Sequence, residues 1–450
     1  MSRLSEAVDW LDSHFSLENS RRGQGNKVNV PTLERIRLCM DYMGEPQDAY
    51  PIVHITGTNG KGSTAWITTE LLKQSGLKVG TYTSPNLERI NERIACDGIP
   101  IPDDELVEEV EALKQLEEHL LGPLTRFELL TALAYRWFAD VAVDAAVIEV
   151  GMGGLWDATN VADATVAVIT NVSYDHVEIL GPTLKDIALE KSGIIKAAST
   201  AVVGEADPEL VSIFVRQAET VGADRLLLRE SDFSCLENRP AVGGRLLSMK
   251  TQEAYYDEVF LSLLGAHQGD NAVLALQAVE SFFGSPLAEE IVENAMSNLA
   301  VPGRLEIVAR HPLCVLDGAH NVGGARVIAR ALEEEFTISS GIYAVVGMLR
   351  GRDPVAMLDT LFPAGGARSR LRQVIACSPL SERALPSREI CDAARGLGLE
   401  AVEASSVAAG VDMALELAGT DDLVLVTGSL YVVGDARSHL AIHRAKLHGG

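Results

Sequence analysis

The chain has 450 residues, of which 47% are hydrophobic, and its 63 acidic and 38 basic residues give a formal net charge of −25 at pH 7. At about 150 residues per domain, this length predicts two or three domains with buried cores, which excludes intrinsic disorder and a fibrous protein. The negative charge argues against a nucleic-acid partner, because such proteins present a basic face to the phosphate backbone. Small anions remain possible ligands where a few cations or backbone amides gather locally.

The N-terminal segment MSRLSEAVDWLDSHF carries Glu6, Asp9 and Asp12 among its apolar residues, so it lacks the apolar core of a secretion signal. No stretch approaches the about 18 consecutive apolar residues of a membrane span. The six cysteines are scattered without paired or metal-type spacing, and we expect reduced thiols. These features predict a cytoplasmic protein with no membrane partner.

Short β-type runs alternate with helical patterns over most of the chain, which is typical of parallel sheets with crossover helices. The first such step is a strand in PIVHITG, a helix that runs to Gly76, and a strand in LKVGTYTS. A helix over 103–120 follows, then a second helix that begins at a capping box formed by Thr125 and Glu128. Strands over 144–150 and 164–172 come next, and then a helix capped by Thr183.

Beyond residue 198, RLLSMKT and YYDEVFLSLL predict a hairpin, and two helices are expected from Asp270 to about Leu299. A new alternation begins after Pro302-Gly303, with strands in PLCVLD, GIYAVVG, RQVIACS and DLVLVTG. We therefore place a domain boundary near residue 300. The expected fold is α/β: a parallel-sheet domain over residues 1–300, followed by a smaller Rossmann-like α/β domain over 301–450.

The strongest local motif, GTNGKGS, lies between a predicted strand and a predicted helix. Its glycines let backbone amides turn toward an anion, its lysine can reach the β- and γ-phosphates, and its serine can ligate Mg²⁺. The spacing departs from GxxxxGK[ST], and the alternative is a glycine-rich connection without a ligand. The strand and helix context together with the lysine favour phosphate binding by Gly57, Thr58, Asn59, Gly60, Lys61, Gly62 and Ser63.

A second group of polar residues follows two buried strands, with Glu149 at the end of one strand and Asp175-His176 after the next. Carboxyl ends of parallel strands meet at one sheet edge, so these side chains are expected beside the phosphate loop as ligands of a metal that bridges phosphates. The alternatives are a helix-capping or salt-bridged carboxylate for Glu149 and a hydrogen-bonded turn histidine for His176. The run GMGG after Glu149 lacks the GxGxxG spacing, which argues against a dehydrogenase.

Two further positions have open interpretations from spacing alone. Lys191, at the end of a predicted helix, is either an exposed helix-end lysine, which is the commoner case, or a functional one. Asp317 and His320 follow the first strand of the second domain. They either contact a ligand or belong to an ordinary strand-to-helix turn in which Asn321 caps the helix.

Together the motifs resemble a known family. HITGTNGKGST, TYTSPNLERINERI, TRFELLT, IEVGMGGLWDATN, ITNVSYDHVEILGPTLKDIALEKSGIIK, HQGDNAVLAL, VPGRLEIV and LDGAHNVGG occur in the order found in folylpolyglutamate synthases and dihydrofolate synthases of the Mur ligase superfamily. The resemblance covers nearly the whole chain. It implies an ATP-dependent amide ligase, with a P-loop-type parallel-sheet ATPase domain that binds ATP and holds the folate site over 1–300, and a smaller Rossmann-like glutamate ligase domain over 301–450. A folate carboxylate would become an acyl phosphate, which the amine of L-glutamate attacks.

The resemblance also implies roles for individual residues. Two Mg²⁺ ions would use Ser63, Ser84, Glu149 and His176, and Lys191 matches the lysine that the family carbamylates. Nucleotide contacts would come from the phosphate loop with Asn271, Arg304 and Asp317, and the candidate catalytic residues are Lys61, Lys191, His176 and His320. The folate pocket would comprise Thr125, Phe127, Glu128, Trp156, Asp157 and Ala158. The implied partners are ATP, L-glutamate and dihydropteroate or folate, bound by a monomer.

Three departures from the family pattern leave the preferred folate form open. Asn86 stands where the family has His, Leu155 replaces an arginine beside Trp156, and the N-terminal stretch SLENSRRGQGNKVNV differs from the usual glycine-leucine segment. The alternatives are an enzyme with only one of the two folate activities, a cell-wall amino-acid ligase of the same superfamily, and a nucleotide-binding switch. The switch leaves Asp317 and His320 without a purpose.

Overall fold

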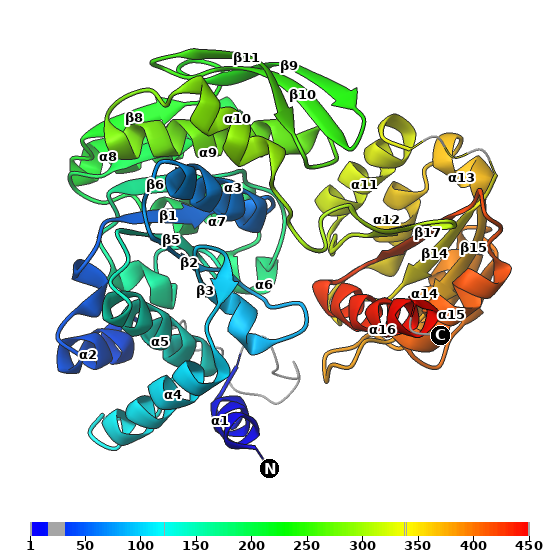
Figure 1. The fold of residues 1–450 in the computed structure, drawn as a ribbon, viewed down its shortest axis with the longest axis horizontal. Helices are drawn as coiled ribbons and strands as arrows, with labels where there is room; N and C mark the ends of the chain where they lie inside the picture. The colour runs from blue at the N-terminus through cyan, green and yellow to red at the C-terminus, as the bar shows by residue number, and fades with distance from the viewer. Residues whose placement is uncertain (1, 17–31, 121, 337, 339, 449–450) are drawn as a thin grey trace. The chain divides into compact units, whose positions relative to one another are not determined.

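The computed structural model describes residues 2–16, 32–120, 122–336, 338 and 340–448 (Figure 1). Contacts divide the chain into two compact units. The first comprises Met1–Arg239, Leu246–Ser262 and Gln268–Leu299, and the second comprises Pro240–Arg245, Leu263–His267 and Ala300–Gly450. The second unit thus includes two short segments that precede residue 300. The N-terminal stretch that departs from the family pattern lies almost entirely outside the described residues.

The first unit is built on an eight-stranded sheet in the order β4-β3-β2-β5-β1-β6-β7-β8. The strands from β2 to β8 in this order are parallel, whereas β3 is antiparallel to both β2 and β4. The bounds are β1 (Ile52–Thr56), β2 (Val79–Tyr82), β3 (Ile94–Cys96), β4 (Ile99–Pro100), β5 (Ala145–Glu149), β6 (Val166–Ile169), β7 (Thr200–Val203) and β8 (Arg225–Leu228). The parallel α/β architecture predicted from the alternating patterns is confirmed.

Helices cover both faces of this sheet. Ile52 of β1 and Ile148 of β5 share a core with Leu106 and Leu133 of α4 and α5, whereas α3 contacts the same strands without contributing to that core and so covers the opposite face. The helices of the unit are α1 (Arg3–Asp12), α2 (Glu34–Tyr42), α3 (Lys61–Gln74), α4 (Asp103–Glu117), α5 (Arg126–Asp140), α6 (Val177–Leu180), α7 (Leu184–Ser192), α8 (Pro208–Val221), α9 (His267–Phe283) and α10 (Glu289–Ser297), with 3₁₀ turns η1 (Pro46–Asp48), η2 (Ile90–Arg93) and η3 (Ala158–Val161).

A separate three-stranded sheet has the order β11-β10-β9, with bounds β9 (Ser234–Ala241), β10 (Gly244–Lys250) and β11 (Tyr255–Leu261). The predicted hairpin corresponds to β10 and β11. The third strand, β9, was missed because SCLENRPA alternates poorly and carries two charged residues and a proline. Helix α10 packs against both β11 and α3, which joins this sheet to the larger one.

The second unit is a six-stranded sheet in the order β12-β13-β17-β14-β15-β16, parallel except for β12. Its strands are β12 (Glu306–Arg310), β13 (Leu313–Leu316), β14 (Ile342–Val346), β15 (Leu371–Ala376), β16 (Ala401–Glu403) and β17 (Leu423–Thr427). Its helices are α11 (Val322–Glu334), α12 (Pro354–Leu361), α13 (Gly366–Arg370), α14 (Ser387–Gly396), α15 (Val407–Leu417) and α16 (Leu430–His448). The four predicted strands are confirmed, and the edge strands β12 and β16 were missed because they are only partly buried.

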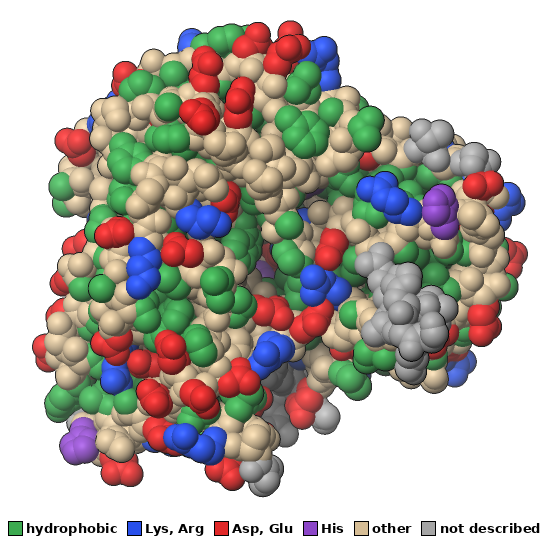
Figure 2. All heavy atoms as spheres, in the orientation of Figure 1, with side chains coloured by type: hydrophobic (Ala, Val, Ile, Leu, Met, Phe, Trp, Pro, Cys, Tyr) green, Lys and Arg blue, Asp and Glu red, His purple; other side chains and the backbone are tan. Residues whose placement is uncertain are grey.

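The surface reflects the net charge. On the face shown in Figure 2, the described acidic side chains are spread over both units, and the Lys and Arg side chains lie singly or in small groups between them. The six cysteines all lie among the described residues, and none of them forms a disulfide. No helix in the described part of the chain is long and apolar enough to cross a membrane.

Gly80 in the middle of β2 allows the sheet to approach α5 closely. A Cβ atom at this position would lie 2.7 Å from the ring of Phe138. We expect Gly80→Ala to lower the free energy of unfolding by about 1–3 kcal/mol, because overpacking forces the ring or the strand to move. Gly396→Ala at the end of α14, where nothing lies within 4 Å, is the matched control and should be neutral or slightly stabilising. Equal calorimetric unfolding temperatures for the two variants would contradict this account.

Candidate functional site

The predicted phosphate-binding loop, residues 57–63, runs from the end of β1 into the first turn of α3 at the carboxyl edge of the large sheet, and is called the phosphate loop below. Two of its glycines permit close approach of neighbouring groups. A Cβ on Gly57 would lie 1.7 Å from the Thr170 hydroxyl, and one on Gly60 would lie 2.5 Å from Asn271 Oδ1, where the backbone is also left-handed with φ of 85°. Only glycine fits both positions, so the loop backbone can face a ligand while other residues pack tightly behind it.

The segment that follows β6 holds the loop in place. Asn59 O accepts hydrogen bonds from Thr170 Oγ1 at 2.6 Å and from Asn171 Nδ2 at 2.8 Å, and the N–H of Asn59 donates to Asn171 Oδ1 at 3.1 Å. The N–H of Ser173 donates to Thr58 Oγ1 at 3.0 Å. These hydrogen bonds fix the loop conformation before any ligand binds. Sequence reasoning missed this role, although the polar run directly after a buried strand was a usable signal.

Two lysines converge on one carbonyl oxygen of this loop. Lys61 Nζ donates to Gly57 O at 3.1 Å, and Lys191 Nζ from α7 donates to the same oxygen at 2.8 Å. Lys191 is buried, so the exposed alternative for this residue is wrong. Burial, followed by the charge of Lys61, lowers the pKa of Lys191 to about 7, although nearby carboxylates including Asp175 and Asp157 oppose the shift. The pair would attract a polyanion to the loop.

The predicted metal ligands lie at the ends of neighbouring strands and at the start of α3. Glu149, buried at the end of β5, accepts a hydrogen bond from the N–H of Ser84 at 3.1 Å. A Cβ on Gly62 would lie 3.7 Å from the Glu149 carboxylate, so this acid lies next to the first turn of α3. Ser63, in the same turn, is also buried. A carboxylate and a hydroxyl are oxygen donors that suit Mg²⁺ when phosphates complete the coordination.

His176 lies at the start of α6 in a left-handed conformation, with φ of 50°. Its backbone N–H donates to Asp175 Oδ1 at 2.9 Å, and its Nε2 lies 3.7 Å from the same oxygen. In the part of the chain that the structure describes, no group of three or more His, Cys, Asp or Glu side chains could hold a metal without other ligands. A site here would therefore need phosphate or water oxygens.

The N-terminal part of α9 reaches the same loop. Gln268 is buried, its Nε2 donates to Ser63 Oγ at 3.4 Å, and its Oε1 accepts from Asn271 Nδ2 at 2.9 Å. The structure thus brings the predicted nucleotide contact Asn271 to Gly60 and Ser63. Gln268 was not predicted as a site residue, although it lies in the HQGDNAVLAL motif that also contains Asn271.

An aromatic wall faces the loop that follows β5. A Cβ on Gly151 would lie 2.4 Å from Phe127 Cζ, and the Phe127 ring lies 6.1 Å from the ring of Tyr82. Trp156 lies against Gly153, at 3.5 Å from a Cβ built there. Phe127 of α5 thus packs against the loop that carries Trp156, and contact of either side chain with substrate stays a prediction. Leu155, which replaces an arginine, is exposed.

Thr125 and Glu128 form the predicted capping box at the start of α5. Thr125 Oγ1 accepts from the N–H of Glu128 at 3.2 Å, and Glu128 Oε2 accepts from the N–H of Thr125 at 2.7 Å. Arg35 also contacts Glu128 at 3.3 Å. The capping prediction is confirmed, and contact of these two residues with substrate stays a prediction.

Asp157 is buried between this loop and η3, beside Ala158. Its Oδ2 accepts from the N–H of Met152 at 2.9 Å, and its Oδ1 accepts from the N–H and the hydroxyl of Thr159. Burial raises the pKa of Asp157, and these hydrogen bonds oppose that rise. The carboxylate therefore organises the loop around itself.

In the second unit, Asp317 directly follows β13. It accepts from the N–H of Leu305 at 2.9 Å and of Ala319 at 2.8 Å, and burial raises its pKa against the opposing charge of Arg304. Arg304 Nη1 would lie 3.1 Å from a Cβ on Gly318. The structure thus groups Arg304 with Asp317.

His320 and Asn321 follow in the same turn. His320 Nδ1 lies 3.1 Å from Gly318 O. Asn321 caps α11 by accepting from the N–H of Gly324 at 2.8 Å, as the alternative interpretation predicted for that residue. The cap accounts for Asn321, whereas contact of His320 with a ligand stays a prediction.

Family models match both parts of the chain. The model for the Mur ligase middle domain matches residues 124–279, and the model for the Mur ligase glutamate ligase domain matches residues 303–430. Two curated relatives are named dihydrofolate synthase/folylpolyglutamate synthase. The one from Mycobacterium tuberculosis is 41% identical over 74% of this chain and 72% of its own length. The one from Bacillus subtilis is 35% identical over 91% of this chain and 95% of its own length.

Solved structures of similar proteins share the whole fold. Folylpolyglutamate synthase of Mycobacterium tuberculosis complexed with ADP has a TM-score of 0.89 and 34% identity, and covers 97% of this chain and 98% of its own. Escherichia coli FolC in complex with DHPP and ADP has a TM-score of 0.85 and 27% identity, and covers 98% of this chain and 99% of its own. Both were solved with ADP bound.

The lowered pKa of Lys191 predicts a dependence of stability on pH. Between about pH 7 and the ordinary lysine pKa of 10.5, the unfolded chain holds a proton on this amine that the folded chain does not. The free energy of unfolding therefore rises with pH in this window, and the cost of burying the charged amine is greatest below pH 7. We expect Lys191→Met to lose this rise, as measured by urea unfolding from pH 6 to 10 in bicarbonate-free buffer.

The matched control is Lys185→Met, which removes an exposed lysine that lies on α7 like Lys191 and pairs with Glu209 of α8. It should retain the pH dependence of the unmodified protein. If Lys191→Met and the unmodified protein follow parallel curves, the buried amine does not titrate near neutral pH.

Proposed function

Because the chain belongs to the folylpolyglutamate synthase/dihydrofolate synthase family of Mur ligases, we propose that it adds L-glutamate to dihydropteroate and to reduced folates at the expense of ATP. The members of this family are ATP-dependent ligases. The observation that carries the proposal is that Lys61 and Lys191 both donate to the Gly57 carbonyl at one edge of the sheet. At the same edge, Glu149 lies next to the first turn of α3, and the loop after β5 packs against Phe127. This edge offers sites for a polyphosphate and for an aromatic acid.

The chemistry begins with a carboxylate of the pterin-bearing substrate. One of its oxygens attacks the γ-phosphorus of ATP, the bond to the β–γ bridging oxygen breaks, and ADP leaves with that oxygen. The amine of glutamate then attacks the acyl carbon of the resulting acyl phosphate, loses a proton, and expels inorganic phosphate. Activation is required because a carboxylate is a poor electrophile, and cations are required because two anions must approach each other.

The residues of the first unit supply that neutralisation. Lys61 would hold the β- and γ-phosphates over the loop amides, and Asn271 would contact the adenine. Ser63 and Glu149 would hold one Mg²⁺, and Ser84, Glu149 and His176 a second. When bound, the two ions would offset the charge of the triphosphate and of the attacking carboxylate.

The buried amine of Lys191 supports carbamylation. Attack on CO₂ requires a neutral amine, and a pKa near 7 leaves much of this lysine neutral at pH 7 to 8. The resulting carbamate would replace a cation by an anion that helps to hold the second metal ion.

We assign the remaining roles to residues on both units. Phe127, Trp156, Asp157 and Ala158 would contact the pterin, with Thr125 and Glu128 at the start of α5. Arg304 would contact the phosphates, Asp317 the ribose, and His320 the nucleotide and the incoming glutamate. The enzyme would act as a cytoplasmic monomer.

The proposal predicts that phosphate release requires three substrates together. We expect release only with ATP, L-glutamate and either dihydropteroate or tetrahydrofolate, with a product heavier by one glutamyl residue in mass spectrometry. Each acceptor is offered separately, since a product from only one of them would identify a monofunctional enzyme. Release with a muramyl-nucleotide acceptor, or with ATP alone, would contradict the proposal.

Lys61→Ala and Glu149→Ala serve as controls for this assay. Each should abolish turnover while the thermal unfolding temperature stays close to that of the unmodified protein, because both side chains lie at the ligand-facing edge of the sheet. Normal turnover in either variant would refute the assigned site.

Carbamylation of Lys191 is testable by ¹³C NMR. With ¹³C-bicarbonate, the protein with its native Lys191 should show a carbamate signal that grows from pH 6 to 8 as the amine loses its proton. The Lys191→Met variant should lack that signal. Identical spectra for the two proteins would exclude the modification at this position.

A further inference from the structure

Strand β1 carries two buried polar side chains that the proposed reaction does not use. His54 and Thr56 are both fully buried, and they point to the same face of the sheet because they are two residues apart. Thr56 Oγ1 donates to Gly153 O at 2.7 Å, and His54 Nε2 lies 2.8 Å from Thr159 Oγ1. Both therefore reach from the strand that ends in the phosphate loop to the segment that follows β5.

The direction of the hydrogen bonds can be assigned. Thr159 Oγ1 donates its one proton to Asp157 Oδ1 at 2.5 Å, because an ionised carboxylate can only accept. The same hydroxyl must then accept from His54, so the imidazole carries its proton on Nε2. Burial lowers the pKa of His54 to about 3, which keeps the ring neutral, and its Nδ1 has no hydrogen-bond partner among the described residues. The chain thus runs from His54 through Thr159 to Asp157.

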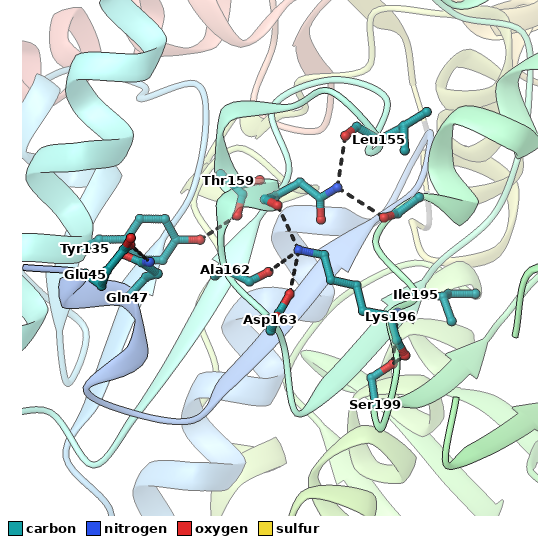
Figure 3. A network of polar contacts seen from close by, with 12 residues as sticks. Glu45, Gln47, Tyr135, Leu155, Thr159, Ala162, Asp163, Ile195, Lys196 and Ser199 are labelled. Atoms are coloured by element: carbon teal, nitrogen blue, oxygen red, sulfur yellow. Dashed lines mark hydrogen bonds and ion pairs between the residues drawn. The ribbon is translucent and has the colours of Figure 1, made fainter. Parts of the chain in front are cut away.

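The turn η3 that carries Thr159 is held from its other sides as well (Figure 3). Tyr135 Oη donates to Thr159 O at 2.7 Å, and Lys196 Nζ donates to Ala162 O at 2.7 Å and to Asn160 O at 2.9 Å. Asn160 Nδ2 donates to Leu155 O at 3.0 Å. With the backbone of η3 fixed in this way, the Thr159 hydroxyl has little freedom except to bridge His54 and Asp157.

The geometry points to His54 and Thr159 as positioning residues for the pterin-bearing substrate. They hold the Asp157 carboxylate, around which the loop bearing Gly151, Gly153 and Trp156 is organised, in the orientation needed for substrate contact. This inference rests on the proposed function, because that function assigns Asp157 and Trp156 to the substrate. Among the described residues, the side-chain hydrogen bonds of His54 and Thr159 do not involve the phosphate loop. Their substitution should therefore change the KM for the pterin-bearing substrate and not the KM for ATP.

Thr159→Val tests the inference because it preserves the shape of the side chain and removes the hydroxyl. We expect the KM for dihydropteroate to rise about tenfold, the effect of losing one hydrogen bond to a charged group, while the KM for ATP stays within about twofold. Thr159→Ser, which restores the hydroxyl, should return the KM for dihydropteroate to within about threefold of the unmodified value. Thr170→Val is the matched comparison, since it removes a hydroxyl that holds the nucleotide loop and should raise the KM for ATP instead.

An unchanged KM for dihydropteroate in Thr159→Val, or equal increases in both KM values, would overturn the inference, as would failure of Thr159→Ser to recover. If Thr159→Val does not fold, His54→Gln, which keeps an N–H donor, is compared with His54→Leu, which has none. The KM for dihydropteroate should then rise in His54→Leu and stay closer to its original value in His54→Gln. Lack of turnover by the unmodified protein with any folate acceptor would refute the proposed function. Normal turnover by that protein with no difference among the variants would refute the inference alone.

Discussion

The shared carbonyl oxygen of Gly57 is the contact on which the rest of the site depends. Two lysines from separate helices donate to it, at 3.1 and 2.8 Å, and bring two basic groups together at the exit of the central strand. Burial of Lys191, followed by the charge of Lys61, disfavours the protonated amine, which is why the pKa of Lys191 falls. A bound polyanion would favour the protonated amines at this oxygen. The site proposed for the triphosphate therefore depends on these two lysines and on the carbonyl oxygen that they share.

The acidic composition of the chain and the cationic site are compatible because they operate at different distances. A net charge of −25 acts over the whole surface, where salt screens it beyond about 8–10 Å. Lys191 is buried close to the loop, where screening is weak. The same sheet edge presents Glu149 next to the first turn of α3, so anionic and cationic groups alternate over a short distance. This alternation suits metal-bridged phosphates better than a uniformly basic surface would.

Strand β1 gives the site its rigidity. Its end leads into the phosphate loop, which hydrogen bonds from the segment after β6 hold in place, and its buried face anchors the loop after β5 through Thr56 and His54. The loop after β5 and the segment after β6 follow the two strands that flank β1 in the sheet. A single central strand therefore supports the regions assigned to both substrates. Relatives of known structure share this whole fold, with TM-scores of 0.85 and 0.89 for the two compared above.

Local patterns in the amino-acid sequence were enough to predict the parallel sheets, the glycine-rich turn between β1 and α3, and the capping box of Thr125 and Glu128, because alternation, glycine placement and short-range side-chain contacts encode them. Polar or partly buried edge strands such as β9 and β16 escaped prediction because they lack a clear alternation. Other contacts became visible only in the folded chain. Lys191 is buried and donates to Gly57, 134 residues away, and His54 contacts Thr159 across a separation of 105 residues. Such contacts depend on which strands lie side by side and how the loops pack above them, and no local pattern specifies those distances.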